Sequence, residues 1–131
     1  MIAGIGCDVS GIGRWENDQT RERLMDRWFC PEETAYVRSR GKAAAQSAAG
    51  IFCAKEALAK ALGTGFSASV LPQDVCVLHT PSGAPFYRLS GAAARTAESL
   101  GIRRFHLSVT HDGGIAAAFC VAEKGSEESC P

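Results

Sequence analysis

The sequence has no excess charge of either sign and no long apolar run. Its 14 basic and 14 acidic residues cancel, so no overall field favours nucleic acid or an acidic membrane as a partner. No stretch approaches the ~20 apolar residues of a membrane helix. Residues 1–9 also lack the basic leader and cleavage site of a signal peptide. We therefore expect a cytoplasmic protein that contacts neither a membrane nor nucleic acid.

Several common site patterns are also missing. None of the six cysteines has the C-x-x-C spacing of a zinc site. No secretory context supports a disulfide framework, so we interpret most of them as small buried thiols. The phosphate-binding patterns GxGxxG and GxxxxGK are absent, which argues against a nucleotide-binding βαβ repeat. The 131 residues suit one domain with one hydrophobic core.

Hydrophobic periodicity predicts a mixture of helices and strands. In chain order these are a buried strand over 2–9, helices within 14–28, 31–40 and 43–62, strands over 74–79 and 85–89, a helix over 91–100, and strands over 105–110 and 115–121, the last pair turning through 111–114. We predict a single α+β domain over residues 1–123 with antiparallel pairing in its second half. A polar tail is expected over 124–131.

The segment FCAKEALAKALGTG, residues 52–65, predicts the end of a helix followed by a glycine-bounded turn. Glu56 and Lys60 are four residues apart and therefore share one helical face. Backbone amides at 63–65 would be available to an anion beside them. The same pattern is typical of a surface ion pair and an ordinary glycine stop, so the residues alone leave both interpretations open.

Asp8 ends the first expected strand, with glycines at positions 4, 6, 11 and 13 around it. An acidic residue at this place has two interpretations. It caps the helix expected to begin near Ile12, or it is a ligand for a cation. Neither is favoured by the residues themselves.

Three blocks of the sequence resemble the holo-acyl-carrier-protein synthases, the small group of 4′-phosphopantetheinyl transferases. The blocks are GIGCDVSGIGRW at 4–15, FCAKEALAKALGTG at 52–65 and HLSVTHDGGIAAAFCV at 106–121. GAPFYRLSG at 83–91 also resembles the family's glycine-x-proline strand. The resemblance covers nearly the whole chain in the family's order. It implies transfer of the phosphopantetheine arm of coenzyme A to a serine of an apo acyl carrier protein, with release of adenosine 3′,5′-bisphosphate.

The resemblance also implies roles for individual residues. Asp8 and Glu56 would be the Mg²⁺ ligands, since this ion prefers hard oxygen ligands and retains water. Lys60 would stabilise charge on the transferred phosphoryl group, and Arg14 would meet the acidic recognition helix of the carrier. Asp8, Glu56, Lys60 and His111 would form the catalytic set. Contacts to coenzyme A are implied for Lys60, Gly63, Thr64, Gly65, Ser108 and His111.

Other interpretations stay open for the last block. A lone histidine in a turn is commonly an exposed side chain without a role, and Asp112 beside it is either ordinary turn chemistry or a group that orients His111 or the incoming serine. The base for that serine is open among Asp8, Glu56 and a water molecule. Ile51 stands where the family usually has arginine, which removes one expected cation near the ligand.

Family members of this length imply a homotrimer, in which Asp8, Glu56 and Lys60 face His111 of the partner subunit. The alternative function is a non-catalytic module that binds coenzyme A or a carrier protein. A third possibility is a structural oligomerisation domain, in which all three blocks are only caps and turns.

Overall fold

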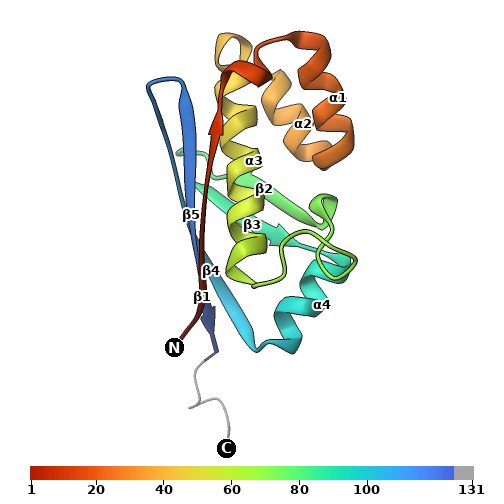
Figure 1. The fold of residues 1–131 in the computed structure, drawn as a ribbon, viewed down its shortest axis with the longest axis vertical. Coiled ribbons are helices and arrows are strands. Elements are labelled where there is room, and N and C mark those ends of the chain that lie inside the picture. The colour runs from red at the N-terminus through yellow and green to blue at the C-terminus, as the bar shows by residue number, and fades with distance from the viewer. Residues whose placement is uncertain (126–131) are drawn as a thin grey trace, which may run out of the picture.

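The computed structural model describes residues 1–125, which form an α+β fold around one long helix (Figure 1). Its elements are β1 (Ile2–Gly11), the 3-10 turn η1 (Gly13–Trp15), α1 (Asp18–Trp28), α2 (Pro31–Arg38), η2 (Gly41–Ala43), α3 (Ala44–Ala61), η3 (Pro72–Asp74), β2 (Val75–His79), β3 (Pro85–Leu89), α4 (Gly91–Ser99), β4 (Ile102–Asp112) and β5 (Ile115–Lys124). The predicted fold class is confirmed. Lys124, assigned to the tail, ends β5, and 126–131 lie outside the described residues.

Two antiparallel sheets are present. β1, β5 and β4 form one sheet in that order, and β2 pairs with β3 in the other. β4 turns into β5 through Gly113 and Gly114, whose φ angles of 58° and 82° suit glycine at both positions of a tight hairpin. The turn is therefore shorter than predicted, and His111 and Asp112 belong to β4.

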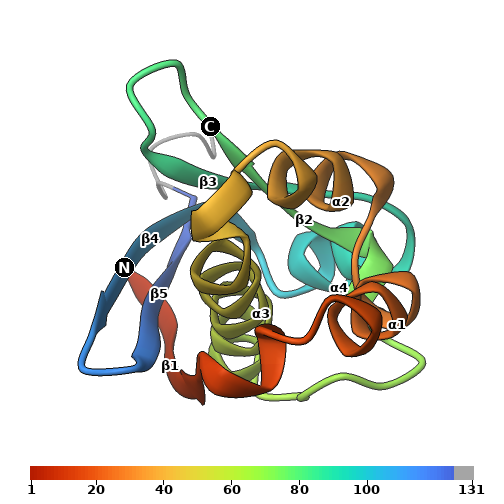
Figure 2. The same ribbon diagram turned by 90° about the horizontal axis from the view of Figure 1, so that it is seen from above.

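Helix α3 lies between the three-stranded sheet on one side and α1 and α2 on the other, as the view along it shows (Figure 2). Its interior positions are largely alanine, including Ala48, Ala54 and Ala57, which are fully buried. Such small side chains allow elements to pack closely on several of its faces. Within residues 1–125, no helix has the length and apolar character needed to cross a membrane.

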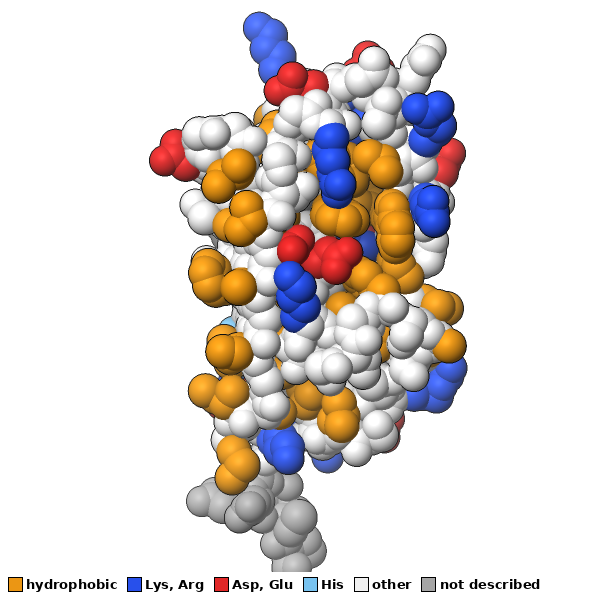
Figure 3. All heavy atoms as spheres, viewed as in Figure 1, with side chains coloured by type: hydrophobic (Ala, Val, Ile, Leu, Met, Phe, Trp, Pro, Cys, Tyr) orange, Lys and Arg blue, Asp and Glu red, His pale blue; other side chains and the backbone are white. Residues whose placement is uncertain are grey.

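The prediction of a buried first strand is wrong for one face of β1. Ile5 and Val9 are 71% and 60% exposed, and Phe119 on the adjacent β5 is 60% exposed. The alternate side chains of β5, such as Ala118 and Cys120, are buried toward α3. Because strand side chains alternate between faces, the sheet has one face covered by α3 and one bare apolar face. The edge of this face lies along β1 in Figure 3.

The prediction that most of the cysteines are small buried thiols is wrong for three of them, because Cys7 is an exposed thiol and two others form a disulfide. Cys30, at the start of α2, forms a disulfide with Cys76 on β2, 46 residues away. Chain spacing gives no signal for a bond between such distant elements. Cys53 and Cys120 are buried free thiols, as predicted, and burial raises the pKa of Cys53 to about 12 and that of Cys120 to about 11.

A buried ion pair also connects α2 to α3 beside that disulfide. Lys55 Nζ lies 2.7 Å from Glu33 Oε1 and donates to the Val75 carbonyl at 2.6 Å. Glu33 also accepts hydrogen bonds from the amides of Cys30 at 2.9 Å and Val77 at 2.8 Å. Burial raises the pKa of Glu33 and lowers that of Lys55, and their mutual attraction opposes both shifts. Neither residue was singled out from the sequence.

Candidate active site

Three residues of the predicted catalytic set, together with the predicted carrier contact Arg14, line one cavity of about 360 Å³, which we call the carboxylate cavity. Its lining consists of Asp8, Val9, Ser10, Gly11, Arg14, Phe52, Glu56 and Lys60. The space-filling view shows acidic side chains gathered between basic ones over β1 and α3 (Figure 3). The first two sequence blocks therefore meet in space.

Glycines in β1 bring Asp8 to this position. A Cβ on Gly4 would lie 2.0 Å from the Ala61 carbonyl oxygen, and one on Gly6 would lie 2.0 Å from that of Ala57. No larger residue permits this approach without displacing β1 or α3. The two glycines therefore hold Asp8 against the helical face that carries Glu56 and Lys60.

Lys60 pairs with Asp8 of β1 and not with Glu56 of its own helix. Lys60 Nζ lies 3.0 Å from Asp8 Oδ1 and 3.0 Å from the Cys7 carbonyl oxygen. No ion pair between Glu56 and Lys60 occurs in the described part of the chain. Burial raises the pKa of Glu56, and the negative charge of Asp8 raises it further. The cavity thus has a carboxylate without a close ammonium partner.

Asp8 does not cap the first helix. Asn17 does so instead, because its Oδ1 accepts a hydrogen bond from the Thr20 amide at 2.9 Å. The sequence left two interpretations open for Asp8, a helix cap and a cation ligand. Its position in the carboxylate cavity is consistent with a cation ligand. A divalent cation with retained water fits two nearby hard carboxylates that repel one another.

A second group of possible metal ligands does not have this chemistry. Cys30, Glu32 and Cys76 have ligand atoms within 4.8 Å of one another. The two sulfur atoms are joined in the disulfide, so no thiolate is available there for a metal.

Arg14 lies at the carboxylate cavity, not on a separate surface. Its guanidinium carbon is 4.7 Å from the centroid of the Phe52 ring and 5.4 Å from that of Trp15. These cation–π contacts hold the charge beside the carboxylates. The positive charge of Arg14 also opposes the rise in the pKa of Glu56.

The turn after α3 differs from the anion site expected there. Gly63 and Gly65 have φ angles of 78° and 61°, as a glycine-terminated helix requires. Their amides donate to the carbonyls of Lys60 at 2.9 Å and Ala59 at 3.2 Å. Thr64 Oγ1 donates to the Gly65 carbonyl at 2.8 Å. In this structure the glycine amides therefore cap the helix.

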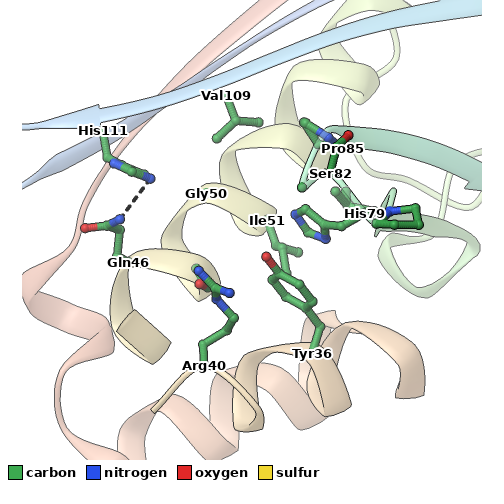
Figure 4. Close-up of a pocket in the computed structure, with 14 residues that line it drawn as sticks. Tyr36, Arg40, Gln46, Gly50, Ile51, His79, Ser82, Pro85, Val109 and His111 are labelled. Carbon is green, nitrogen blue, oxygen red and sulfur yellow. Dashed lines mark hydrogen bonds between the residues drawn. The ribbon is translucent and has the colours of Figure 1, made fainter. Parts of the chain in front are cut away.

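His111 lines another cavity, of about 490 Å³, on a different face of α3 (Figure 4). We call it the histidine cavity. His111 Nε2 lies 2.9 Å from Gln46 Nε2, and Ile51 lines the same space. Within one chain, the structure therefore does not bring His111 to the residues Asp8, Glu56 and Lys60.

Ser108 and Asp112 line neither cavity. Ser108 pairs with Phe119 across the strands and is exposed, so it lies on the bare face of the sheet. Sequence reasoning missed Arg40, Gln46 and His79 in the histidine cavity. These residues come from three separate segments and form no motif along the chain.

Comparison with known proteins places the chain in one family. The model of the 4′-phosphopantetheinyl transferase superfamily matches residues 4–123. The chain belongs to this superfamily. A holo-[acyl-carrier-protein] synthase of Methylobacterium sp. (strain 4-46) is 48% identical over 99% of this chain and 100% of its own length. One from Cutibacterium acnes is 46% identical over 94% of this chain and 99% of its own.

Solved structures of the superfamily have the same fold. The holo-[acyl-carrier-protein] synthase of Neisseria meningitidis superimposes with a TM-score of 0.85 at 34% identity, covering 95% of this chain and 100% of that one. The enzyme of Helicobacter pylori in complex with coenzyme A gives a TM-score of 0.77 at 27% identity, covering 91% and 99%. The relatives and the shared fold therefore identify the chain as an enzyme of the phosphopantetheinyl transferase class.

Proposed function

We propose that this protein is a holo-[acyl-carrier-protein] synthase, which transfers 4′-phosphopantetheine from coenzyme A to a serine of an apo acyl carrier protein. The observation that carries the proposal is the convergence of Asp8, Glu56 and Lys60 in one cavity of a chain of this superfamily. A module that only binds coenzyme A has no need of a carboxylate whose pKa is raised by burial next to a second carboxylate.

The reaction exchanges one phosphorus–oxygen bond for another. The serine oxygen bonds to the phosphorus that carries pantetheine, and the bond from this phosphorus to the oxygen bridging the two phosphates breaks. Adenosine 3′,5′-bisphosphate leaves with that oxygen, and the serine proton passes to a base. Catalysis of such a step depends on positioning and on stabilising the developing charge.

The residues of the carboxylate cavity suit this work. Asp8 and Glu56 would hold Mg²⁺, which would offset the negative charge of the pyrophosphate. Lys60 Nζ, now 3.0 Å from Asp8 Oδ1, is close enough to this site to donate to phosphate oxygens. Gly63, Thr64, Gly65 and Ser108 remain proposed contacts to coenzyme A, in which the glycines act through the turn that they shape.

We further propose that the active protein is a homotrimer. The bare sheet face with Ile5, Val9 and Phe119 exposed is an apolar surface that another copy would cover. His111 lines a cavity on a different face of α3 from that of Glu56, and a partner subunit that contributed its histidine cavity would bring both sets of residues to one coenzyme A. Light scattering that gives a monomer under assay conditions would contradict this.

Arg14 is the proposed contact to the carrier. Arg14→Ala should raise the KM for the carrier more than it raises the KM for coenzyme A, because the carrier's acidic helix loses a cation. Since Arg14 also lies beside the carboxylates, equal increases in both values would assign it to coenzyme A instead.

Intact mass spectrometry tests the function directly. Apo carriers of fatty acid and polyketide synthesis would be incubated with the protein, coenzyme A and Mg²⁺, with EDTA in a matched sample. We expect a Mg²⁺-dependent mass gain of one phosphopantetheine on at least one carrier. Coenzyme A binding without any mass gain would favour the non-catalytic module.

A further inference from the structure

One covalent bond joins α2 to the sheet of β2 and β3. Cys30 immediately precedes the first residue of α2, Cys76 is the second residue of β2, and their sulfur atoms form a disulfide. The two residues are only 5% and 3% exposed. Neither cysteine has a role in the proposed transfer of phosphopantetheine, so the chemistry of this pair needs a separate account.

The sulfur atoms lie under an exposed ion pair. Arg88 of β3, the cross-strand partner of Cys76, pairs with Glu32 of α2, and both side chains are about half exposed. Arg88 Nη2 is 3.6 Å from Cys76 Sγ, and a carboxylate oxygen of Glu32 lies within 4.8 Å of both sulfur atoms. Because an exposed ion pair is held weakly, its side chains can move aside and let a small thiol reach the disulfide.

The charges around the bond favour exchange with a thiol. A disulfide breaks when a thiolate attacks one sulfur and the other sulfur leaves as a thiolate, so stabilising the leaving thiolate speeds the step. The guanidinium of Arg88 faces Cys76, and the positive end of α2 faces Cys30. The carboxylate of Glu32 opposes both effects, and Arg88 offsets part of its charge.

Other contacts between α2 and β2 do not depend on the disulfide. Glu33, in the first turn of α2, accepts a hydrogen bond from the Val77 amide at 2.8 Å, and Lys55 compensates its charge. Farther along both elements, the Tyr36 ring stacks on His79 with 3.9 Å between centroids (Figure 4). Reduction of the disulfide would therefore remove one link and leave α2 in place with a weaker hold on β2.

We propose that Cys30–Cys76 is a reversible thiol–disulfide exchange site of the folded protein, that its partner is a dithiol reductant, and that its state controls how firmly α2 is held on β2. A thiolate of the dithiol bonds to Cys30 Sγ, the disulfide bond breaks, and the electron pair stays on Cys76 Sγ beside Arg88. The second thiol of the reductant then displaces Cys30 Sγ and closes a cyclic disulfide. The dithiol loses two electrons and two protons, and both cysteines become thiols. This exchange is independent of the proposed function.

Dithiothreitol without denaturant tests the exchange. Samples would be quenched with acid, unfolded, alkylated and mapped by peptide mass spectrometry. We expect Cys30 and Cys76 to gain their alkyl groups together, and to lose them again after oxidised glutathione replaces the reductant, while circular dichroism shows a folded protein throughout. Reduction only at denaturant concentrations that unfold the chain would overturn the proposal, as would thiols at both positions under every condition.

Two charge variants separate the chemistry from simple uncovering. Glu32→Gln and Arg88→Gln both break the covering ion pair, so better access alone would speed reduction in both. The charges predict opposite effects. Glu32→Gln should raise the rate about 3- to 10-fold, because it removes the charge that repels the attacking thiolate, and Arg88→Gln should lower it by a similar factor. Glu98→Gln and Arg95→Gln, at exposed positions of α4, are the matched controls and should change neither rate. Equal acceleration in both test variants would overturn the part given to Arg88.

Hydrogen exchange tests the effect on α2. The amides of residues 31–38 should exchange faster in the reduced protein, while those of residues 44–61 in α3 keep their rates. The double variant with serine at positions 30 and 76 should match the reduced protein and should not respond to dithiothreitol. Equal exchange of α2 before and after reduction would overturn the proposed control, and so would unfolding of the whole chain on reduction.

Discussion

Helix α3 carries two lysines, Lys55 and Lys60, and each pairs with a carboxylate from another element. The side chains of Lys55 and Glu33 are 1% and 0% exposed, whereas those of Lys60 and Asp8 are 51% and 18% exposed. In the buried pair, both carboxylate oxygens accept hydrogen bonds, and the ammonium donates to two acceptors. Beside the open pair, Glu56 adds a second carboxylate that forms no ion pair within residues 1–125.

This difference separates a structural pair from a reactive one. The Glu33–Lys55 pair is buried, and its charges are compensated by groups of the protein itself. The carboxylate cavity is open to solvent and brings two carboxylates together, and a metal ion bound there would offset their mutual repulsion. Lys55 and Glu56 are adjacent in the sequence, yet one maintains the fold while the other belongs to the proposed site.

Breaking the buried pair should have the largest effect on stability. Lys55→Met leaves Glu33 buried without its ammonium and should lower the free energy of unfolding by about 3–5 kcal/mol. Urea titration followed by circular dichroism measures this. The double variant Glu33→Gln, Lys55→Met removes the isolated charge and should recover a substantial part. A single variant as stable as the unmodified protein would refute the structural role.

Removing the Cys30–Cys76 disulfide should have the next largest effect on stability. It closes a loop of 46 residues beside the buried pair, so the double variant with serine at both positions should lose about 2–4 kcal/mol. Thermal unfolding with and without a reductant provides the measurement. Reductant should lower the Tm of the unmodified protein and leave that of the double variant unchanged, and identical responses would contradict the bond.

The open pair should contribute little to stability. Lys60→Met should change the free energy of unfolding by less than about 1 kcal/mol, since an exposed pair is screened by solvent. The same change should lower kcat by about 10²–10³-fold, the cost of losing one charge-stabilising donor in an active site. A loss of stability comparable to that of Lys55→Met would remove the distinction between the two lysines.

The smallest effect concerns the pH dependence of stability. Because the pKa of Glu56 is raised from its ordinary 4.5 in the folded protein, the native state binds this proton more tightly than the unfolded chain does. The contribution of Glu56 to stability therefore falls as pH rises through the window above 4.5. Glu56→Gln should be slightly more stable than the unmodified protein at pH 7. Adding Mg²⁺ should raise the Tm of the unmodified protein and not that of the variant.

The sequence predicted the parts of this molecule that depend on local pattern. Element order, α3 with its glycine stop, and the grouping of Glu56 with Lys60 on one face follow from periodicity. The Lys60–Asp8 pair, the disulfide and the buried Glu33–Lys55 pair depend on contacts between distant elements, so no spacing along the chain indicates them. The exposure of one face of β1 was not predicted. Gly4 and Gly6 on the covered face are not polar, so the strand lacks the alternation of apolar and polar residues that marks a half-buried strand.

The most direct test of the account is the carrier mass assay on Glu56→Gln, after circular dichroism has shown that the variant is folded. The unmodified protein should convert an apo carrier to the form that carries phosphopantetheine, and the folded variant should leave the carrier mass unchanged over the same time. Near-normal conversion by the variant would contradict the assignment of Glu56 to the metal site and, with it, the division of α3 into a structural and a reactive pair.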